Sequence, residues 1–194
     1  MKGKELQIWS AHEGGINRAI FSPDGQMLAT ASKDKTVKFW SIAGKKLEDF
    51  KGFNSGLIGI WFSRKDNKFA PATSGVTIPF WQRKGEKIKI FNNTSDCIWS
   101  VIFSQDDRTI AATRTTEKAV KVWSVDGNQK AVLKGHTDGV NSVSFSPDGH
   151  IIATASWDKT VRLWSKEGQE IATLKGHSDG VHSVIFSLAM TVKR

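Results

Sequence analysis

The sequence predicts an all-β protein built of repeated four-stranded units, and three observations carry that prediction. Tryptophan recurs at Trp40, Trp81, Trp123 and Trp164, with spacings of 41, 42 and 41 residues. The first residue of the repeating unit recurs at the same interval, and every unit contains several short apolar runs. A period near forty with short strands is typical of the four-stranded blade of a β-propeller. The expected fold is therefore a series of antiparallel blades arranged around a common axis.

The repeat divides residues 1–194 into one continuous segment of such blades. Complete units are predicted at about 12–50, 53–91, 94–133 and 136–174, and a partial repeat at 177–194. Residues 3–9 align with 168–174, the outer strand of a unit, so the chain is expected to open with a lone outer strand. After Ser187 the expected turn is replaced by other residues, so only an inner strand at 181–187 is expected there. The sequence thus predicts an incomplete propeller.

The innermost strand of each unit carries apolar residues at positions i, i+3 and i+5. In the fourth unit these residues are Val140, Val143 and Phe145. Side chains of a regular strand alternate with a period of two, so the odd step predicts a β-bulge. The same pattern occurs at Ile16, Ala19, Phe21; Leu57, Ile60, Phe62; Ile98, Val101, Phe103; and Val181, Val184, Phe186.

Turn residues separate the predicted strands. Ser-Pro-Asp-Gly at 22–25 and 146–149 predicts a tight hairpin, because proline fixes one φ angle and glycine closes the turn. The following strands are rich in alanine, which suits close packing between blades. In the second unit Pro71 and Pro79 remove hydrogen-bond donors from two strands, so we expect this blade to be the least stable.

These motifs resemble those of the WD40 repeat family over nearly the whole chain. Gly135-His136 and Gly176-His177 resemble its Gly-His pair, and Ser32-Lys33-Asp34 and Ser156-Trp157-Asp158 its Ser-x-Asp turn. The near-identical units are similar to tandem, bacterial-type WD40 arrays. The resemblance implies a non-catalytic scaffold or sensor for protein–protein interaction, and a larger regulatory signalling protein as its context.

The resemblance also implies that two units carry a hydrogen-bonded tetrad of His, Ser, Asp and Trp. The members are His12, Ser32, Asp34 and Trp40, and His136, Ser156, Asp158 and Trp164. Serine, histidine and an acid can perform nucleophilic catalysis, but an active site is normally built once, whereas these residues recur with the repeat. A structural role is therefore predicted, with no catalytic residue. Phosphate-loop, dinucleotide and metal-binding motifs are lacking, so no cofactor or metal is expected.

A partner-binding face follows from the same resemblance, because WD40 relatives commonly bind peptides near the start of the inner strand and before the turn Asp. The positions in this sequence are Asn17, Lys33, Ile58, Trp99, Asn141, Trp157 and His182. Trp99 and Trp157 are not the repeat tryptophans, and exposed tryptophan is frequent among binding hot spots. The alternative for both is packing: Trp157 over its own turn, and Trp99 in the space of the histidine that the third unit lacks.

The net charge of +9, from 28 Lys and Arg against 19 Asp and Glu, raises a second function. Such a surface can bind nucleic acid or other acidic partners. The lysines are spread over turns and outer strands without an aromatic stacking pattern, which favours a solvated surface over a nucleic-acid site. The single cysteine, Cys97, suits a reducing compartment, and no signal peptide or membrane-spanning run is found. We therefore expect a cytoplasmic protein without a membrane partner.

Unpaired strand edges are the last expectation from the sequence. Complete blades flanked by lone strands leave edges that can pair with another chain. Two interpretations stay open. The chain is a truncated piece of a longer array, which residues 188–194 favour because they interrupt a unit, or copies associate and supply strands to one another.

Overall fold

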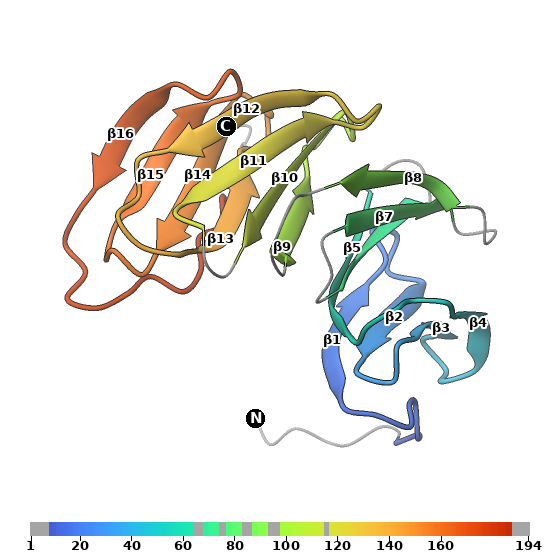
Figure 1. The fold of residues 1–194 in the computed structure, drawn as a ribbon. Helices are drawn as coiled ribbons and strands as arrows, with labels where there is room; N and C mark the ends of the chain where they lie inside the picture. The colour runs from blue at the N-terminus through green and yellow to red at the C-terminus, as the bar shows by residue number, and fades with distance from the viewer. Residues whose placement is uncertain are drawn as a thin grey trace, which may run out of the picture.

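Four antiparallel sheets of four strands each make up the computed structural model, which describes residues 8–63, 68–73, 77–82, 87–92, 98–114 and 117–187 (Figure 1). The first sheet contains β1 (Ile16–Phe21), β2 (Met27–Ser32), β3 (Val37–Ser41) and β4 (Lys46–Phe50). The second contains β5 (Leu57–Phe62), β6 (Lys68–Thr73), β7 (Thr77–Gln82) and β8 (Lys87–Asn92). The third contains β9 (Ile98–Phe103), β10 (Thr109–Arg114), β11 (Ala119–Ser124) and β12 (Gln129–Lys134). The fourth contains β13 (Val140–Phe145), β14 (Ile151–Ser156), β15 (Val161–Ser165) and β16 (Glu170–Leu174).

The strands of every sheet follow the chain order, so each sheet is a simple meander. This confirms the predicted all-β fold of repeated four-stranded antiparallel units. The predicted unit boundaries themselves stay a prediction.

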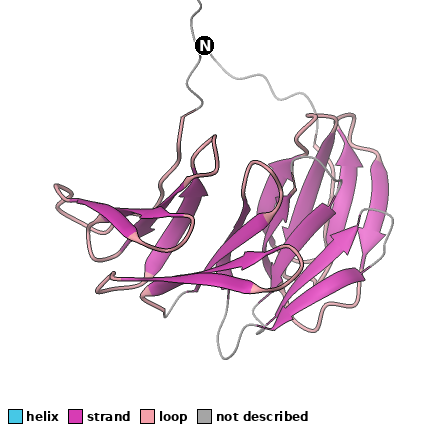
Figure 2. Ribbon diagram, turned by 90° about the horizontal axis from the view of Figure 1, so that it is seen from above, coloured by secondary structure: helices cyan, strands magenta, loops and turns pink. Residues whose placement is uncertain are grey.

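The sheets follow one another in chain order, with each inner strand next to the preceding sheet (Figure 1). Figure 2 shows the same row of sheets from above. Strand β5 packs against β1 and β2, strand β9 against β5 and β6, and strand β13 against β9 and β10. In the part of the chain that the structure describes, no strand of the first sheet pairs with a strand of the fourth. The described sheets therefore form an open series.

The core lies between neighbouring sheets. Ala29 and Ala31 of β2 are fully buried with Leu57 and Ile60 of the next inner strand, and the rings of Phe39 and Phe69 meet edge to face at 5.1 Å. Alanine side chains keep the two sheets close, as the small-residue strands predicted. Burial of these apolar surfaces is the main force that holds one sheet against the next.

A β-bulge interrupts the inner strand of every sheet, as predicted. In the pairing of β13 with β14, Val140 is opposite Ser156 and Ser142 is opposite Ala155, which leaves Asn141 without an opposing residue. The same single-residue irregularity occurs at Asn17, Ile58 and Trp99 in the other three inner strands. A bulge turns the extra residue out of the ladder and re-aims its side chain.

The second sheet has a shortened central pairing. Cα pairs between β6 and β7 are Lys68–Gln82 and Phe69–Trp81, at the end away from Pro71 and Pro79. The equivalent pairing of β2 with β3 runs from Met27–Ser41 to Ala31–Val37. Proline has no backbone N–H to donate, which accounts for a short ladder here. The lower stability of this sheet stays a prediction.

The two lone strands expected at the ends differ from the prediction. Most of the predicted outer strand lies in residues 1–7, outside the described residues, and Ile8 and Trp9 are not in a strand. The predicted inner strand at 181–187 is wrong: this segment runs beside β13 but forms no strand. Its backbone N–H groups at Val184 and Phe186 donate to the serine hydroxyls of β13, at 3.4 Å each, instead of to a backbone ladder. A search of the described ranges finds no candidate for a membrane-spanning helix.

Candidate partner-binding face

A buried hydrogen-bond relay fixes the loop before each inner strand in the first and fourth sheets. In the fourth, Trp164 Nε1 donates to Thr154 Oγ1 at 2.8 Å, Thr154 Oγ1 lies 2.7 Å from His136 Nε2, and His136 Nδ1 lies 2.7 Å from Asp158 Oδ2. The first sheet repeats these distances within 0.1 Å, through Trp40, Thr30, His12 and Asp34. The relay therefore ties the third strand, the second strand, the entry loop and the turn together.

The hydroxyl in this relay is threonine, so the predicted tetrad serines Ser32 and Ser156 were wrong. The register of β14 with β15 places Ile152 opposite Trp164. The indole therefore reaches Thr154, two residues along the same face, whereas Ser156 lies two residues further on. Ser156 Oγ donates instead to the carbonyl of Gly139 at 2.9 Å and accepts from Asp158 N at 3.1 Å.

Burial sets the charge state of this relay. Burial lowers the pKa of His136 below its usual value, and the hydrogen bond from the imidazole to Asp158 only partly opposes that effect. Burial raises the pKa of Asp158, but hydrogen bonds from Thr160 and His136 outweigh it and lower the pKa to about 2. Burial also raises the pKa of Asp34, but hydrogen bonds from Thr36 and His12 outweigh it and lower that pKa to about 2. A neutral imidazole that donates from Nδ1 to an ionised carboxylate satisfies every member of the relay.

The relay has the order acid, histidine, hydroxyl, which is also the order of a hydrolytic triad. However, the hydroxyl oxygen of Thr154 is fully buried and already bonded to the Trp164 indole. A nucleophile must reach a substrate, and this oxygen cannot. The geometry therefore serves the fold.

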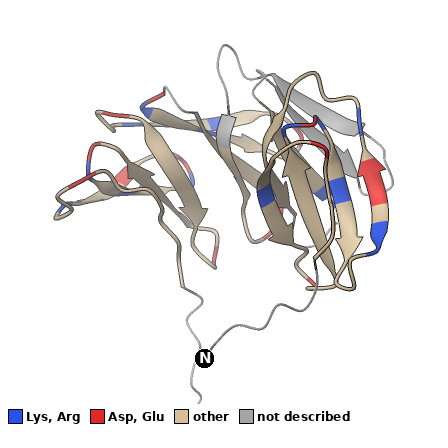
Figure 3. Ribbon diagram, turned by 90° about the horizontal axis from the view of Figure 1, so that it is seen from below, with Lys and Arg blue, Asp and Glu red and all other residues tan. Residues whose placement is uncertain are grey.

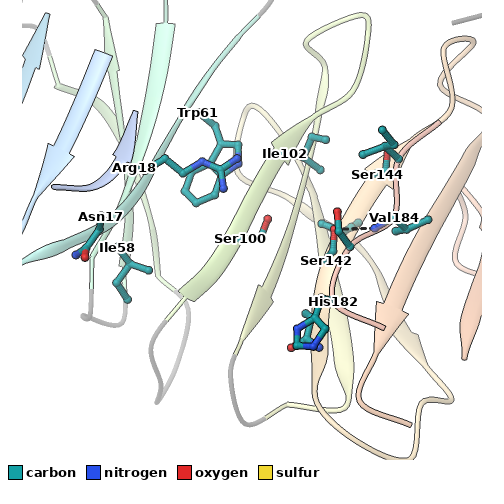
Figure 4. Close-up of a pocket in the computed structure, with 14 residues that line it drawn as sticks. Asn17, Arg18, Ile58, Trp61, Ser100, Ile102, Ser142, Ser144, His182 and Val184 are labelled. Atoms are coloured by element: carbon teal, nitrogen blue, oxygen red, sulfur yellow. Dashed lines mark hydrogen bonds between the residues drawn. The ribbon is translucent and has the colours of Figure 1, made fainter. Parts of the chain in front are cut away.

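A cavity of about 690 Å³ opens on the inner strands, between the first and fourth sheets (Figure 4). The bulge residues Asn17, Ile58 and Asn141 line it, and His182 of the C-terminal segment completes the set. The structure thus brings together four of the seven residues predicted for partner binding. For Trp99, only its backbone place at the bulge of β9 is described, so its side chain lies outside the described part.

Two of these cavity residues have a structural bond that the sequence prediction missed. Asn17 Nδ2 donates to the carbonyl of Leu57 at 2.6 Å, and Asn141 Nδ2 donates to the carbonyl of Val181 at 3.1 Å. Each bond reaches the residue that begins the i, i+3, i+5 apolar pattern of the next unit, 40 residues along the chain. The recurrence of asparagine at one position of the repeat was the available signal.

The remaining two predicted residues, Lys33 and Trp157, lie on the turns rather than in the cavity. The backbone N–H of Lys33 donates to the carbonyl of Gly15 at 2.9 Å, and that of Trp157 donates to the carbonyl of Gly139 at 3.0 Å. These bonds fix both turns against the entry loops.

Trp157 is 44% exposed and forms the rim beside His182. The two rings meet edge to face, with centroids 4.5 Å apart and planes at 80°. A Cβ added at Gly180 would lie 2.2 Å from the Trp157 ring, so the glycine makes room for the indole. Trp157 therefore packs against the segment that follows its sheet and keeps part of its side chain exposed.

Sequence reasoning also missed Arg18 and Trp61, which line the cavity from β1 and β5. The Arg18 guanidinium lies over the Trp61 ring, with its central carbon 5.1 Å from the centroid (Figure 4). Arg18 is one residue after the bulge of β1, and Trp61 is three residues after the bulge of β5. Their direction into the cavity therefore depends on a bulge that shifts the alternation of side chains along the strand.

Outside the cavity, the charged residues of the described ranges do not form a patch of one sign. Figure 3 shows Lys and Arg interspersed with Asp and Glu over the loops and outer strands. The densest basic cluster of the sequence, residues 83–89, has no described side chains. Over the same described ranges, no three His, Cys, Asp or Glu side chains are grouped to hold a metal ion.

Several curated proteins share one repeat with this chain. A stretch of 41 residues is 49% identical to human WD repeat-containing protein 86, covering 21% of this chain and 11% of that protein. Protein HIR1 of Mycosarcoma maydis is 54% identical over 35 residues, which is 18% of this chain and 3% of the relative. Target of rapamycin complex subunit LST8-1 of Arabidopsis thaliana is 49% identical over 39 residues, 20% and 13% respectively. The matches thus span a small part of each relative's length.

A family model gives the broader match. The model described as "WD domain, G-beta repeat" matches residues 3–41, 85–124 and 127–165, which together are more than half of the chain. The matched ranges end one residue after the repeat tryptophans Trp40, Trp123 and Trp164. Together with the four-stranded antiparallel sheets, this match shows that the chain belongs to the WD40 repeat family.

Proposed function

We propose that this chain is a non-catalytic interaction module that binds a protein or peptide on the face where the cavity opens. One observation carries the proposal: the bulges of β1, β5 and β13 turn one residue each, Asn17, Ile58 and Asn141, toward a shared cavity. WD40 repeats typically act as protein-interaction scaffolds and are generally non-catalytic. One matched relative is named as a subunit of a complex, which is in keeping with this role.

The rim supplies the anchor for a partner. The Trp157 indole is held in place by His182 and Gly180, yet almost half of its surface is exposed. A fixed aromatic ring loses little conformational freedom on binding, which is why tryptophan is frequent among hot spots. The mixture of amide, apolar and imidazole groups in the cavity favours a peptide over a purely apolar ligand.

The test is a pull-down from the native host with the wild-type chain, Trp157→Ala and Trp157→Phe. We expect proteins retained by the wild type to be lost with alanine and largely kept with phenylalanine, which preserves a ring beside His182. Ile42→Ala, which truncates an apolar side chain that is also exposed on a turn but lies outside the cavity lining, is the matched control. Unchanged retention by the Trp157→Ala variant, with an unchanged melting temperature, would contradict the proposed anchor.

Electrostatic binding of nucleic acid or acidic surfaces is the second candidate, supported by the net charge of +9. The two functions differ in their dependence on salt. A complex made with phosphates weakens steeply as salt rises, because bound counterions are released, whereas a hot-spot interface does not. Binding of a duplex oligonucleotide measured across a salt series therefore separates them.

The cellular setting is also part of the proposal. We place the chain in the cytoplasm as part of a larger signalling protein, with self-association through open strand edges as the alternative. Immunoblotting of fractionated host cells gives the size and compartment of the native protein. Light scattering of the purified chain would reveal a closed oligomer.

A further inference from the structure

The cavity contains a cation but no acid among the described residues that line it. Its lining includes Arg18, two asparagines, four serines and His182, and no Asp or Glu. Over the described ranges Arg18 makes no ion pair, and its recorded partner is the face of Trp61. A cation–π contact holds the guanidinium in place and leaves its N–H groups available, since the attraction comes from the ring face.

The wall opposite Arg18 offers further donors (Figure 4). Ser142 Oγ accepts from Val184 N and Ser144 Oγ accepts from Phe186 N, both at 3.4 Å. A serine hydroxyl has one proton to donate besides the lone pairs that accept. Among the described residues neither hydroxyl has an acceptor for that proton. Each wall therefore has donors for which the described residues supply no acceptor, the guanidinium N–H groups on one side and the two hydroxyls on the other.

A group that complements this cavity is an acceptor with negative charge. A carboxylate fits the planar guanidinium through two parallel N–H···O bonds, and it can also accept from hydroxyls. We propose that the cavity recognises an acidic peptide segment, with an Asp or Glu side chain bound to Arg18 beside Trp61. This inference rests on the proposed function, and it adds the chemical class of the partner.

The stacked arrangement explains why an exposed arginine can be selective. Trp61 covers one face of the guanidinium and fixes its plane, so fewer side-chain orientations are lost when a carboxylate binds. Lysine carries the same charge without a planar fork, so it offers a point charge only.

The experiment measures fluorescence anisotropy of short labelled peptides that contain Glu, each paired with a counterpart in which Gln replaces Glu. The purified wild-type chain is compared with Arg18→Gln, Arg18→Lys and Trp157→Ala. We expect the wild type to bind Glu peptides about tenfold more tightly than their Gln counterparts, the scale of one charge-assisted contact. Arg18→Gln should abolish that preference, and Arg18→Lys should retain only part of it.

The outcomes separate the two proposals. Loss of the Glu preference in Arg18→Gln, with melting unchanged, supports acidic recognition even if Trp157→Ala has no effect, in which case only the rim anchor fails. Equal binding of both peptide sets, no binding of the Glu peptides by the wild type, or a preference that survives Arg18→Gln would overturn the inference. Arg18-dependent binding of a single-stranded oligonucleotide in place of the peptides would also overturn it, in favour of phosphate.

Discussion

Strands β1 and β13 carry the same apolar pattern but differ sharply in burial. In β13, Val140 is 1% and Phe145 is 8% exposed, whereas in β1 the equivalent Ile16 is 48% and Phe21 is 65% exposed. Both strands pair with their own sheet through the same bulge. The difference lies in the neighbour: β13 packs on the third sheet, and no described sheet precedes β1.

This comparison separates two kinds of stabilisation. Pairing, turns and the threonine relay are internal to a sheet and are alike in the first and fourth sheets. Burial of the inner strand is supplied by the preceding sheet, so it depends on position in the series. Repeat proteins in general divide their stability in this way, between each unit and its interfaces.

The largest expected effect comes from truncating the equivalent phenylalanines. Phe145→Ala removes a buried ring from the contact with the third sheet and should lower the free energy of unfolding by about 3–5 kcal/mol. Phe21→Ala removes an exposed ring and should change it by about 0.5 kcal/mol or less. Denaturant unfolding of the two variants measures both values. Equal losses would mean that another surface covers β1 in solution.

The relay gives the next largest effect, and it should be equal in the two sheets. Thr154→Val and Thr30→Val keep the shape of the side chain but leave the histidine and the indole without their shared oxygen. Each should cost about 1–3 kcal/mol, the range for stranding buried polar groups. Hydrogen exchange in β14 and β2 reports each sheet separately.

Thr113→Val of the third sheet is the matched control for that pair. Thr113 occupies the same position, ten residues before Trp123, but its buried hydroxyl has no hydrogen-bond partner among the described residues. Replacing it should be neutral or slightly stabilising, because no bond is lost and an unsatisfied group is removed. A loss as large as that of Thr154→Val would show that the Thr113 hydroxyl is bonded in solution.

The presence of Thr154 in the relay, where Ser156 was predicted, shows how much of the structure could be predicted from the sequence. The repeat period predicted the number and strand order of the described sheets, and the odd apolar spacing predicted the bulges, because both depend on local pattern. The choice of Thr154 over Ser156 depends on strand register, which the Ser-x-Asp motif does not contain. Register places the indole opposite Ile152, and that pairing decides which hydroxyl it meets.

The cavity shows a second limit of sequence reasoning. Asn17 and Asn141 were predicted as partner-binding residues because of their place in the repeat, and the structure shows that each also holds the next unit. Arg18 and Trp61 are neighbours only because β1 and β5 lie side by side, a contact between units that no motif within one unit encodes. The segment at 181–187 was predicted as a strand from its own pattern, but a strand needs a backbone ladder beside it.

The pH dependence of stability should report the buried relay of the fourth sheet. The folded pKa of His136 is lowered, so below about 6.5, the ordinary value, the unfolded chain binds a proton that the folded chain does not. Stability is therefore full above that pH and falls as the pH drops toward the folded pKa. A second loss, from Asp34 and Asp158, should follow between pH 3.8 and about 2. Thermal melting across pH measures both windows, and the upper one should be reduced in His136→Gln.

The smallest effect is expected from the asparagine bonds between units. Asn141→Ala removes a 3.1 Å bond to the Val181 carbonyl from a partly buried side chain, which should cost about 0.5–1.5 kcal/mol. The loss should be local, because residues 181–187 have no strand partner among the described residues. They are held by side-chain bonds to β13 and by one backbone bond, from Val181 N to the Ser156 carbonyl at 2.9 Å. Faster amide exchange at Val184 and Phe186 would reveal it.

Asn17→Ala is the matching variant of the first sheet, because it removes the equivalent bond to the Leu57 carbonyl. Strand β5 still pairs with β6 in this variant, so amide exchange in β5 should rise less than exchange in 181–187 does in Asn141→Ala. If exchange in 181–187 of Asn141→Ala rises no more than exchange in β5 of Asn17→Ala, the C-terminal segment is held mainly by its apolar contacts with Val161 and Ala155.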